Sequence, residues 1–242
     1  MGEALLWGLV GGSALILGGL LTLALPTPQR LLGLVMAFGS GILISAVAYE
    51  LVGEALDTTT GGKGVGLGLA AGTLAFLAGD VMISRMGGGK RKHSGGAQKE
   101  GSPLAIVLGI ILDGVPESIV IGLTVLQNQV GVALIGAVFV SNVPEAVAAS
   151  SGLAVSGWKR GHIIGLWVGV TIVAGISSVA GYAIFDTASP DTLAFVLAFA
   201  GGALLTMLAD TMMPEAFEHG GKLVGSFTTL GFAVGIGLTA LQ

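Results

Sequence analysis

Long runs of apolar residues recur along the whole chain, and short polar stretches separate them. We count eight runs, each of 18 or more mostly apolar residues, and such a run as a helix is long enough to cross a hydrocarbon core about 30 Å thick. Strand-like alternation in segments of about ten residues, as in a membrane β-barrel, is not the pattern here. The predicted spans are Ala4–Leu25, Leu31–Leu56, Val65–Met86, Pro103–Leu126, Val130–Ser156, His162–Phe185, Thr192–Glu218 and Leu223–Leu241.

Composition strengthens this prediction. Of the 242 residues, 53% are hydrophobic and only 10% are charged, whereas a soluble domain carries about 25% charged residues. The connections are short, so residues 1–242 should form a single transmembrane domain. The Gly-, Ser- and Lys-containing segment 87–101 is predicted to be a flexible linker. With no cysteine in the chain, thiolate ligands and disulfides are excluded.

The basic residues predict how the spans are oriented. Nine of the ten Lys and Arg residues follow predicted spans 1, 3, 5 and 7, and Lys63 is the exception. Under the positive-inside rule, these connections and the linker 87–101 are cytoplasmic, and both termini lie outside. The expected location is therefore the cell membrane, with lipid as the surrounding partner and no nucleic acid.

Two segments repeat at an offset of 161 residues. The offset aligns Phe38-Gly39-Ser40-Gly41 with Phe199-Ala200-Gly201-Gly202, and it pairs Glu54 with Glu215. Spans 2 and 7 run in opposite directions, so the repeat is inverted, as in many transporters. The predicted fold is an all-α polytopic membrane protein with eight transmembrane helices in a 3+2+3 arrangement.

The central pair of spans carries two Val-Pro-Glu sequences. Asp113-Gly114-Val115-Pro116-Glu117 lies within span 4, and Ser141-Asn142-Val143-Pro144-Glu145 lies within span 5. Residues three and four apart share a helix face, and each proline frees a carbonyl one turn earlier, at Leu112 and Val140. Facing spans would bring these oxygen groups together, and a divalent cation would compensate the crowded carboxylates.

Other acids extend this hypothesis. Asp210 lies well inside span 7 and is predicted to join the site, while Glu50 in span 2 could join it. Glu54, Glu215 and His219, nearer the span ends, could be entry or exit ligands, or simply be solvated at the interface. Each acid could instead be a protonated or hydrogen-bonded core residue. No basic residue lies within these spans, so we expect no internal salt bridge to account for them.

At these residues the chain resembles the ZIP (ZRT/IRT-like) family of divalent metal transporters. The resemblance rests on the two Pro-Glu sequences, on Phe38-Gly39-Ser40-Gly41-Ile42-Leu43, and on the segment Asp210–Glu215. It implies alternating access toward the cytoplasm, with spans 1, 4, 5 and 6 moving against spans 2, 3, 7 and 8. It also implies a homodimer, no enzymatic activity and no prosthetic group, with metal as the substrate. The implied ligands are Asp113, Glu117, Ser141, Asn142, Glu145 and Asp210.

The chain departs from that family where histidine is usual. Asp113 stands at the usual His of span 4, and Ser141 stands at a place where span 5 offers His or Gln. A site of oxygen ligands suits Mn²⁺ better than Zn²⁺, so we expect a shift toward Mn²⁺ or Fe²⁺, with Zn²⁺ and Cd²⁺ as further candidates. The alternatives are a proton-coupled carrier of another small cationic or polar solute, and a membrane metal-binding protein or sensor without transport.

Overall fold

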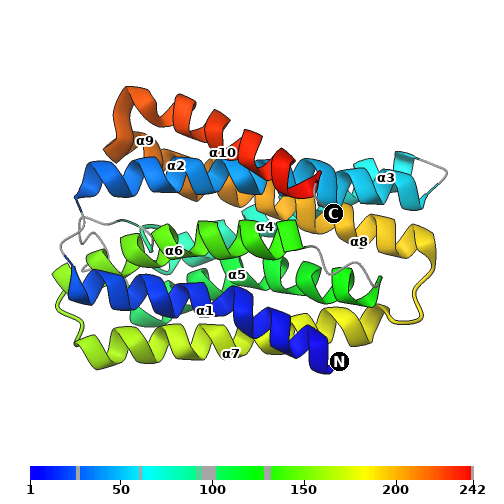
Figure 1. Cartoon of the computed structure of the whole chain (residues 1–242). Helices are drawn as coiled ribbons and strands as arrows, with labels where there is room; N and C mark the ends of the chain where they lie inside the picture. Colours follow the sequence, from blue (N-terminus) through cyan, green and yellow to red (C-terminus); the bar gives the residue numbers. More distant parts are fainter. Residues whose placement is uncertain (26–27, 60–61, 92, 94–101, 128–131, 241–242) are drawn as a thin grey trace.

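A computed structural model describes residues 1–25, 28–59, 62–91, 93, 102–127 and 132–240, and these form helices with short connections (Figure 1). The elements are α1 (Gly2–Ala24), α2 (Gln29–Ala46), η1 (Val47–Gly53), α3 (Glu54–Thr58), α4 (Gly62–Arg85), α5 (Pro103–Leu126), α6 (Val132–Val155), α7 (Arg160–Phe185), α8 (Pro190–Met207), η3 (Leu208–Met212), α9 (Met213–Gly220), η4 (Gly221–Leu223) and α10 (Val224–Thr239).

Among the described residues, seven continuous helical segments are long and apolar enough to cross a membrane. The last of them covers 50 residues, from Pro190 to Thr239, and includes α8, α9 and α10. This segment turns back on itself at Gly221, where φ is +61°, a conformation that glycine adopts without steric cost. After the turn, α10 runs back alongside α2 (Figure 1). The all-helical membrane class predicted from the sequence is confirmed.

The sequence explains where several helices begin. Pro103 and Pro190 stand in the first turns of α5 and α8, where a missing N–H costs nothing. The Oγ of Ser189 caps α8 by accepting a hydrogen bond from the backbone N–H of Thr192, at 3.3 Å. Pro116 and Pro144 lie inside α5 and α6, and both helices continue through them.

Two segments wind more loosely than an α-helix. Residues Val47–Gly53 (η1) join α2 to α3 as a π-helix, and Leu208–Met212 (η3) joins α8 to α9 in the same way. Glu50 lies in the first segment and Asp210 in the second. Such π-helical turns are rare and are often found at functional sites.

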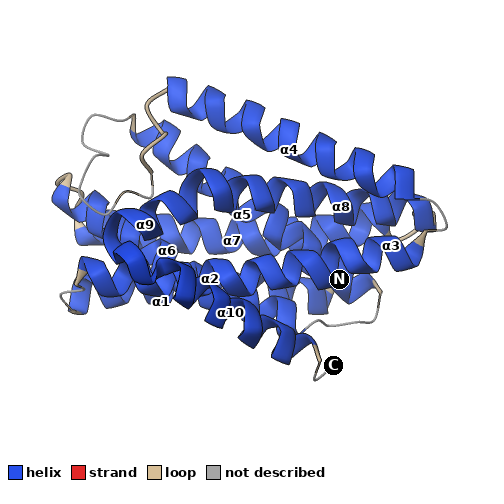
Figure 2. Ribbon diagram, turned by 90° about the horizontal axis from the view of Figure 1, so that it is seen from above, coloured by secondary structure: helices blue, strands red, loops and turns tan. Residues whose placement is uncertain are grey.

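The helices pack most extensively in two sets. The first set joins α1, α5, α6 and α7, and the second joins α2, α3, α4, α8, α9 and α10. Seen from above, α4 forms one outer edge of the bundle (Figure 2). In the second set, Gly72 of α4 lies against the carbonyl oxygen of Phe199, and Gly231 of α10 lies against that of Phe38. Any side chain at either glycine would collide with backbone, so the small residue sets the helix separation.

The two ends of the bundle differ in their segments. Both chain termini lie at one end, together with the tip of α3 (Figure 1). The segment after α4, the connection from α6 to α7 and the turn after α9 lie at the opposite end, which we call the linker end. Residues 92 and 94–101 of the predicted linker lie outside the described residues.

Candidate metal sites

The α5 half of the predicted site is buried. The side chains of Asp113 and Glu117 are only 1% and 3% exposed, although both are carboxylates in an otherwise apolar helix. They lie one turn apart on α5, as their spacing predicts. Burying an ionised carboxylate is costly unless a counter-charge or hydrogen bonds compensate it, so the groups around each one matter.

Asp113 has a cationic partner. Arg91, which follows α4, donates from Nε to Oδ2 of Asp113 and from Nη2 to Oδ1, both at 2.8 Å. Its Nη1 lies 2.8 Å from Oδ1 of Asp80 on α4. The expectation that no internal salt bridge accounts for the buried acids is therefore wrong for Asp113. The cation comes from outside the spans and reaches in from the linker end.

Arg91 packs closely against α5. Its side chain is 1% exposed, although composition predicted an unpacked linker around it. A methyl group placed on Gly109, one turn before Asp113 on α5, would collide with Cδ of Arg91 and come within 2.8 Å of its Nε. The missing side chain at Gly109 is what allows the arginine stem to lie flat against α5.

The carboxylates keep Arg91 charged. Burial alone would lower the pKa of Arg91, but the charges and hydrogen bonds of Asp113, and then those of Asp80, raise the pKa above its ordinary value. An arginine holding a carboxylate with two parallel hydrogen bonds is one of the strong charge-assisted arrangements. In this structure both oxygens of Asp113 are therefore held by a fixed cation.

The α6 half of the predicted site packs against two helices. Oγ of Ser141 donates to the carbonyl of Val138 at 3.0 Å, and Cα of Ser141 lies 3.0 Å from where a Cβ of Gly39 on α2 would stand. Nδ2 of Asn142 lies 3.5 Å from the carbonyl oxygen of Gly11 on α1. Glu145, one turn further along α6, is 5% exposed. All three predicted α6 ligands are thus buried.

A small cavity joins the two halves. Glu117 and Ser118 of α5 and Asn142 of α6 line it, together with apolar residues of α1 and α7, and its volume is about 10 Å³. That is roughly the space needed to place one water molecule or one ion. Gly114 also borders the cavity, and a methyl group added there would meet nothing within 4 Å. The structure therefore brings Glu117 and Asn142 to one small space, which Asp113, Ser141 and Glu145 do not line.

The remaining predicted residues are placed differently. Asp210 on η3 is exposed, and Glu50 on η1 is only partly buried. Oε1 of Glu54 lies 3.4 Å from Nε2 of Gln127, at the end of α5, and 3.4 Å from Oγ1 of Thr58. These three acids do not line the cavity that Glu117 and Asn142 border.

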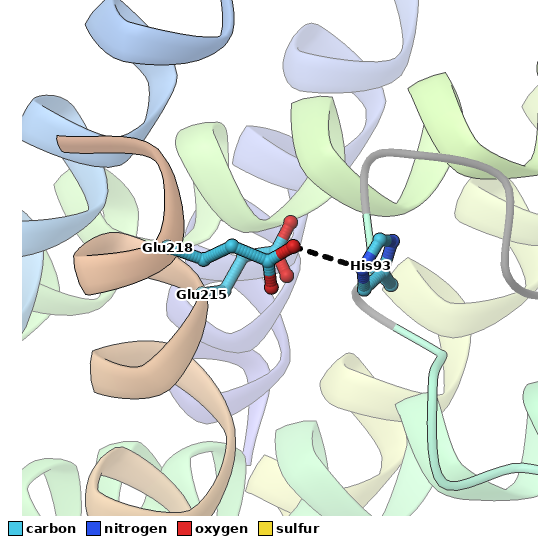
Figure 3. A group of neighbouring side chains, drawn as sticks. All are labelled: His93, Glu215 and Glu218. Carbon is cyan, nitrogen blue, oxygen red and sulfur yellow. Dashed lines mark ion pairs between the residues drawn. The ribbon is translucent and has the colours of Figure 1, made fainter. Parts of the chain in front are cut away.

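A second cluster of possible metal ligands lies at the linker end (Figure 3). One ligand atom from each of His93, Glu215 and Glu218 falls within 4.8 Å of the others. Nε2 of His93 lies 3.4 Å from Oε1 of Glu218, and Nε2 of His219 lies 3.0 Å from Oε1 of Glu215. Imidazole and carboxylate together suit Zn²⁺ and other divalent transition metals.

The sequence predicts only part of this cluster. Glu215 and His219 are pathway candidates because they lie near a span end, but no pattern in the sequence joins His93 to them. His93 comes from the segment after α4 and the acids come from α9, so a distance of more than 100 residues in the chain separates them. The i, i+3 spacing of Glu215 and Glu218 was the only local signal.

Helices suited to crossing a membrane, with buried carboxylates between them, define a polytopic membrane protein with a polar interior. The chain is 27% identical over 229 residues to two proteins named zinc transporter ZupT, both from Salmonella paratyphi A. The match covers 90% of this chain and 88% of each relative. No family model matches the chain. The similarity supports the relation to the ZIP family that the two Pro-Glu sequences predict, and an integral membrane location.

Proposed function

We propose that this protein is a transporter of divalent metal ions, which moves its cargo toward the cytoplasm by alternating access. The observation that carries the proposal is the burial of Glu117 and Glu145 within apolar, proline-containing helices, in a chain similar over 90% of its length to a zinc transporter. Ionisable groups held inside a membrane domain usually serve a transport or binding function.

Two structural coincidences support the inverted repeat. The π-helical segments begin at Val47 and Leu208, which are 161 positions apart, as are the repeated sequences. Phe38 and Phe199 are also 161 positions apart, and the carbonyl oxygen of each packs against a glycine of a neighbouring helix. Helices α2 and α8 would then be equivalent, and so would α4 and α10. With α10 as a separate crossing, the chain has eight spans in the 3+2+3 order.

The two packing sets fit the rigid bodies that alternating access needs. One set contains the proposed spans 1, 4, 5 and 6, and the other contains spans 2, 3, 7 and 8. Helices α4 and α5 touch only lightly, and the main contact between the two sets is that of α2 with α6. Motion of one set against the other would expose the space between them first at one end and then at the other.

In this mechanism Glu117 and Glu145 are the central ligands of the metal. Asp113, Ser141 and Asn142 supply further oxygen atoms, and Asp210 reaches a second metal when the two sets approach. Glu50 and Glu54 serve the approach from the outer end. The cluster of His93, Glu215 and Glu218, with His219 beside it, receives the ion at the linker end, which the basic residues place in the cytoplasm.

The ligand types predict the cargo. All the central ligands are oxygen donors, and oxygen ligands favour Mn²⁺ and Fe²⁺ relative to Zn²⁺ more than imidazole does. We therefore propose that the chain discriminates less strongly in favour of zinc than a carrier with histidines in these positions. Zinc uptake that persists against a large excess of Mn²⁺ would refute this preference.

Metal flux into liposomes containing the purified chain tests the function. Uptake of Mn²⁺ or Zn²⁺ should saturate, and Glu117→Gln should abolish it while leaving the elution volume of the protein unchanged. Asp57→Asn, which removes a carboxylate from an exposed position on α3, is the matched control. Absence of flux in the parent protein, with metal-dependent thermal stabilisation intact, would instead favour a binding protein or sensor.

A proton-coupled carrier of another solute is the remaining alternative. It predicts proton flux that metal neither drives nor inhibits. Parallel recording of internal pH and internal metal in the same liposomes separates the two carriers, because only a metal transporter couples the two signals.

A further inference from the structure

We propose that Arg91 is a tethered cation that competes with the cargo metal for Asp113, so that metal can occupy this end of the site only when Arg91 leaves it. The competition between Arg91 and metal for Asp113 concerns binding alone. Its role in transport rests on the proposed function. The competition follows from the geometry of Asp80, Arg91 and Asp113.

The first step is the repulsion between a metal ion and the guanidinium already bound to Asp113. Nε and Nη2 of Arg91 each lie 2.8 Å from a different oxygen of Asp113, and the carboxylate is buried. A metal ion at this carboxylate would need one of the same oxygens as a ligand. The guanidinium and the metal would then share one small space with two like charges, which a poorly solvated environment does not tolerate.

The second step is the balance of charge. Among the contacts that the structure describes, Asp80 and Asp113 supply two negative charges and Arg91 supplies one positive charge. Removing Arg91 would take one positive charge away from these carboxylates. With Arg91 in place, an added divalent cation would be repelled by the guanidinium. Arg91 therefore lowers the affinity of this place for a divalent ion while keeping its carboxylates compensated.

The third step is the position of the triad between the two packing sets. Asp113 belongs to α5 in one set and Asp80 belongs to α4 in the other, so the guanidinium bridges them. The bridge lies toward the linker end, from which Arg91 enters. Separation of α4 from α5 at this end would stretch or break the bridge and leave Asp113 to the metal, so exchange of the two cations accompanies opening.

Gly109 makes this arrangement testable without changing any charge. The arginine stem lies where a side chain on Gly109 would stand. Gly109→Ala should therefore push Arg91 away from Asp113 while Asp80, Arg91 and Asp113 all remain. It should mimic the loss of the arginine.

The first experiment measures Mn²⁺ and Zn²⁺ binding to the purified full chain by titration calorimetry. Arg91→Gln and Gly109→Ala should each bind divalent cation with affinity about tenfold higher than the parent, a coupling typical of mutually dependent sites. Lys90→Gln removes the same charge from an exposed neighbouring residue and should bind like the parent. Parent-like affinity in both Arg91→Gln and Gly109→Ala would overturn the proposal.

The second experiment uses the unaltered protein, so it does not depend on whether Arg91→Gln folds. Phenylglyoxal modifies accessible arginines, and peptide mass spectrometry reports each one. Arg91 should react slowly without metal and faster as Mn²⁺ is added, with the exposed Arg85 as the internal reference. Labelling of Arg91 that does not respond to saturating Mn²⁺ would overturn the exchange.

Different results would refute the proposed transport function and the proposed exchange of Arg91 for metal. Metal flux in liposomes with no effect of Mn²⁺ on Arg91 labelling would refute the exchange and leave the transporter standing. Metal-dependent labelling of Arg91 in a protein that moves no metal would refute the transporter and keep the competition.

Discussion

Asp113→Asn should destabilise the protein, because it removes the charge that holds Arg91 while keeping nearly the same shape. Breaking one partner of a buried ion pair costs about 3–5 kcal/mol. Asp80, which is 18% exposed, keeps its contact with Nη1 of Arg91 and compensates part of the remaining charge. We therefore expect the free energy of unfolding to fall by about 3 kcal/mol, the lower end of that range.

A double-mutant cycle tests the origin of this loss. The free energy of unfolding is measured in mixed detergent micelles for the parent, Asp113→Asn, Arg91→Gln and the double variant. The double variant buries no unpaired charge from either residue, so it should recover much of the loss, and the coupling energy should be about 2–3 kcal/mol.

Two results would refute this reasoning. A coupling energy below about 0.5 kcal/mol would mean that the pair behaves like one on the surface. A loss in Lys90→Gln equal to that in Arg91→Gln would mean that the general field of the linker end, and not the bidentate contact, is responsible.

Three further predictions concern the sites and the packing. Glu218→Gln should weaken the binding of Zn²⁺ at the linker end by about tenfold, in the range seen when the surroundings of a metal are altered, and metal titration of the purified chain measures it; unchanged affinity would remove Glu218 from the site. Asp113→His should raise Zn²⁺ uptake relative to Mn²⁺ in liposome competition, since imidazole favours zinc, and an unchanged ratio would separate Asp113 from metal selection. Gly72→Val should lower the thermal unfolding temperature, because its side chain would meet the backbone of Phe199, whereas Gly66→Val, where a Cβ meets nothing within 4 Å, should leave that temperature unchanged.

Much of the fold follows from local sequence pattern. Apolar length predicts the helices, Pro103 and Pro190 predict two of their starts, and the repeat at Phe38 and Phe199 predicts equivalent packing that the glycine contacts support. The π-helical segments could not be predicted, because nothing in the sequences of η1 and η3 marks their looser backbone winding. The number of crossings stays a prediction, since α8 to α10 form one helical run with a turn inside it.

The candidate site shows more clearly what the sequence pattern cannot predict. Burial of Glu117 and Glu145 could be predicted, because their positions in apolar runs are a property of each helix alone. The partner of Asp113 could not, because Arg91 lies in a stretch of Gly, Ser and Lys that carries no periodic signal. Gly109, against which the arginine stem lies, is one of 43 glycines and nothing in the sequence singles it out.

The glycine contacts within the second set also bear on what can move. At Gly72 and Gly231 one helix touches the backbone of another, so a small slide would drive the side chains beside each glycine into the neighbouring chain. Sliding by less than a full helical turn is therefore blocked, and each pair, α4 with α8 and α10 with α2, should move as one rigid unit. Bending must then occur elsewhere, and the loosely wound segments η1 and η3, which follow α2 and α8, are the expected hinges.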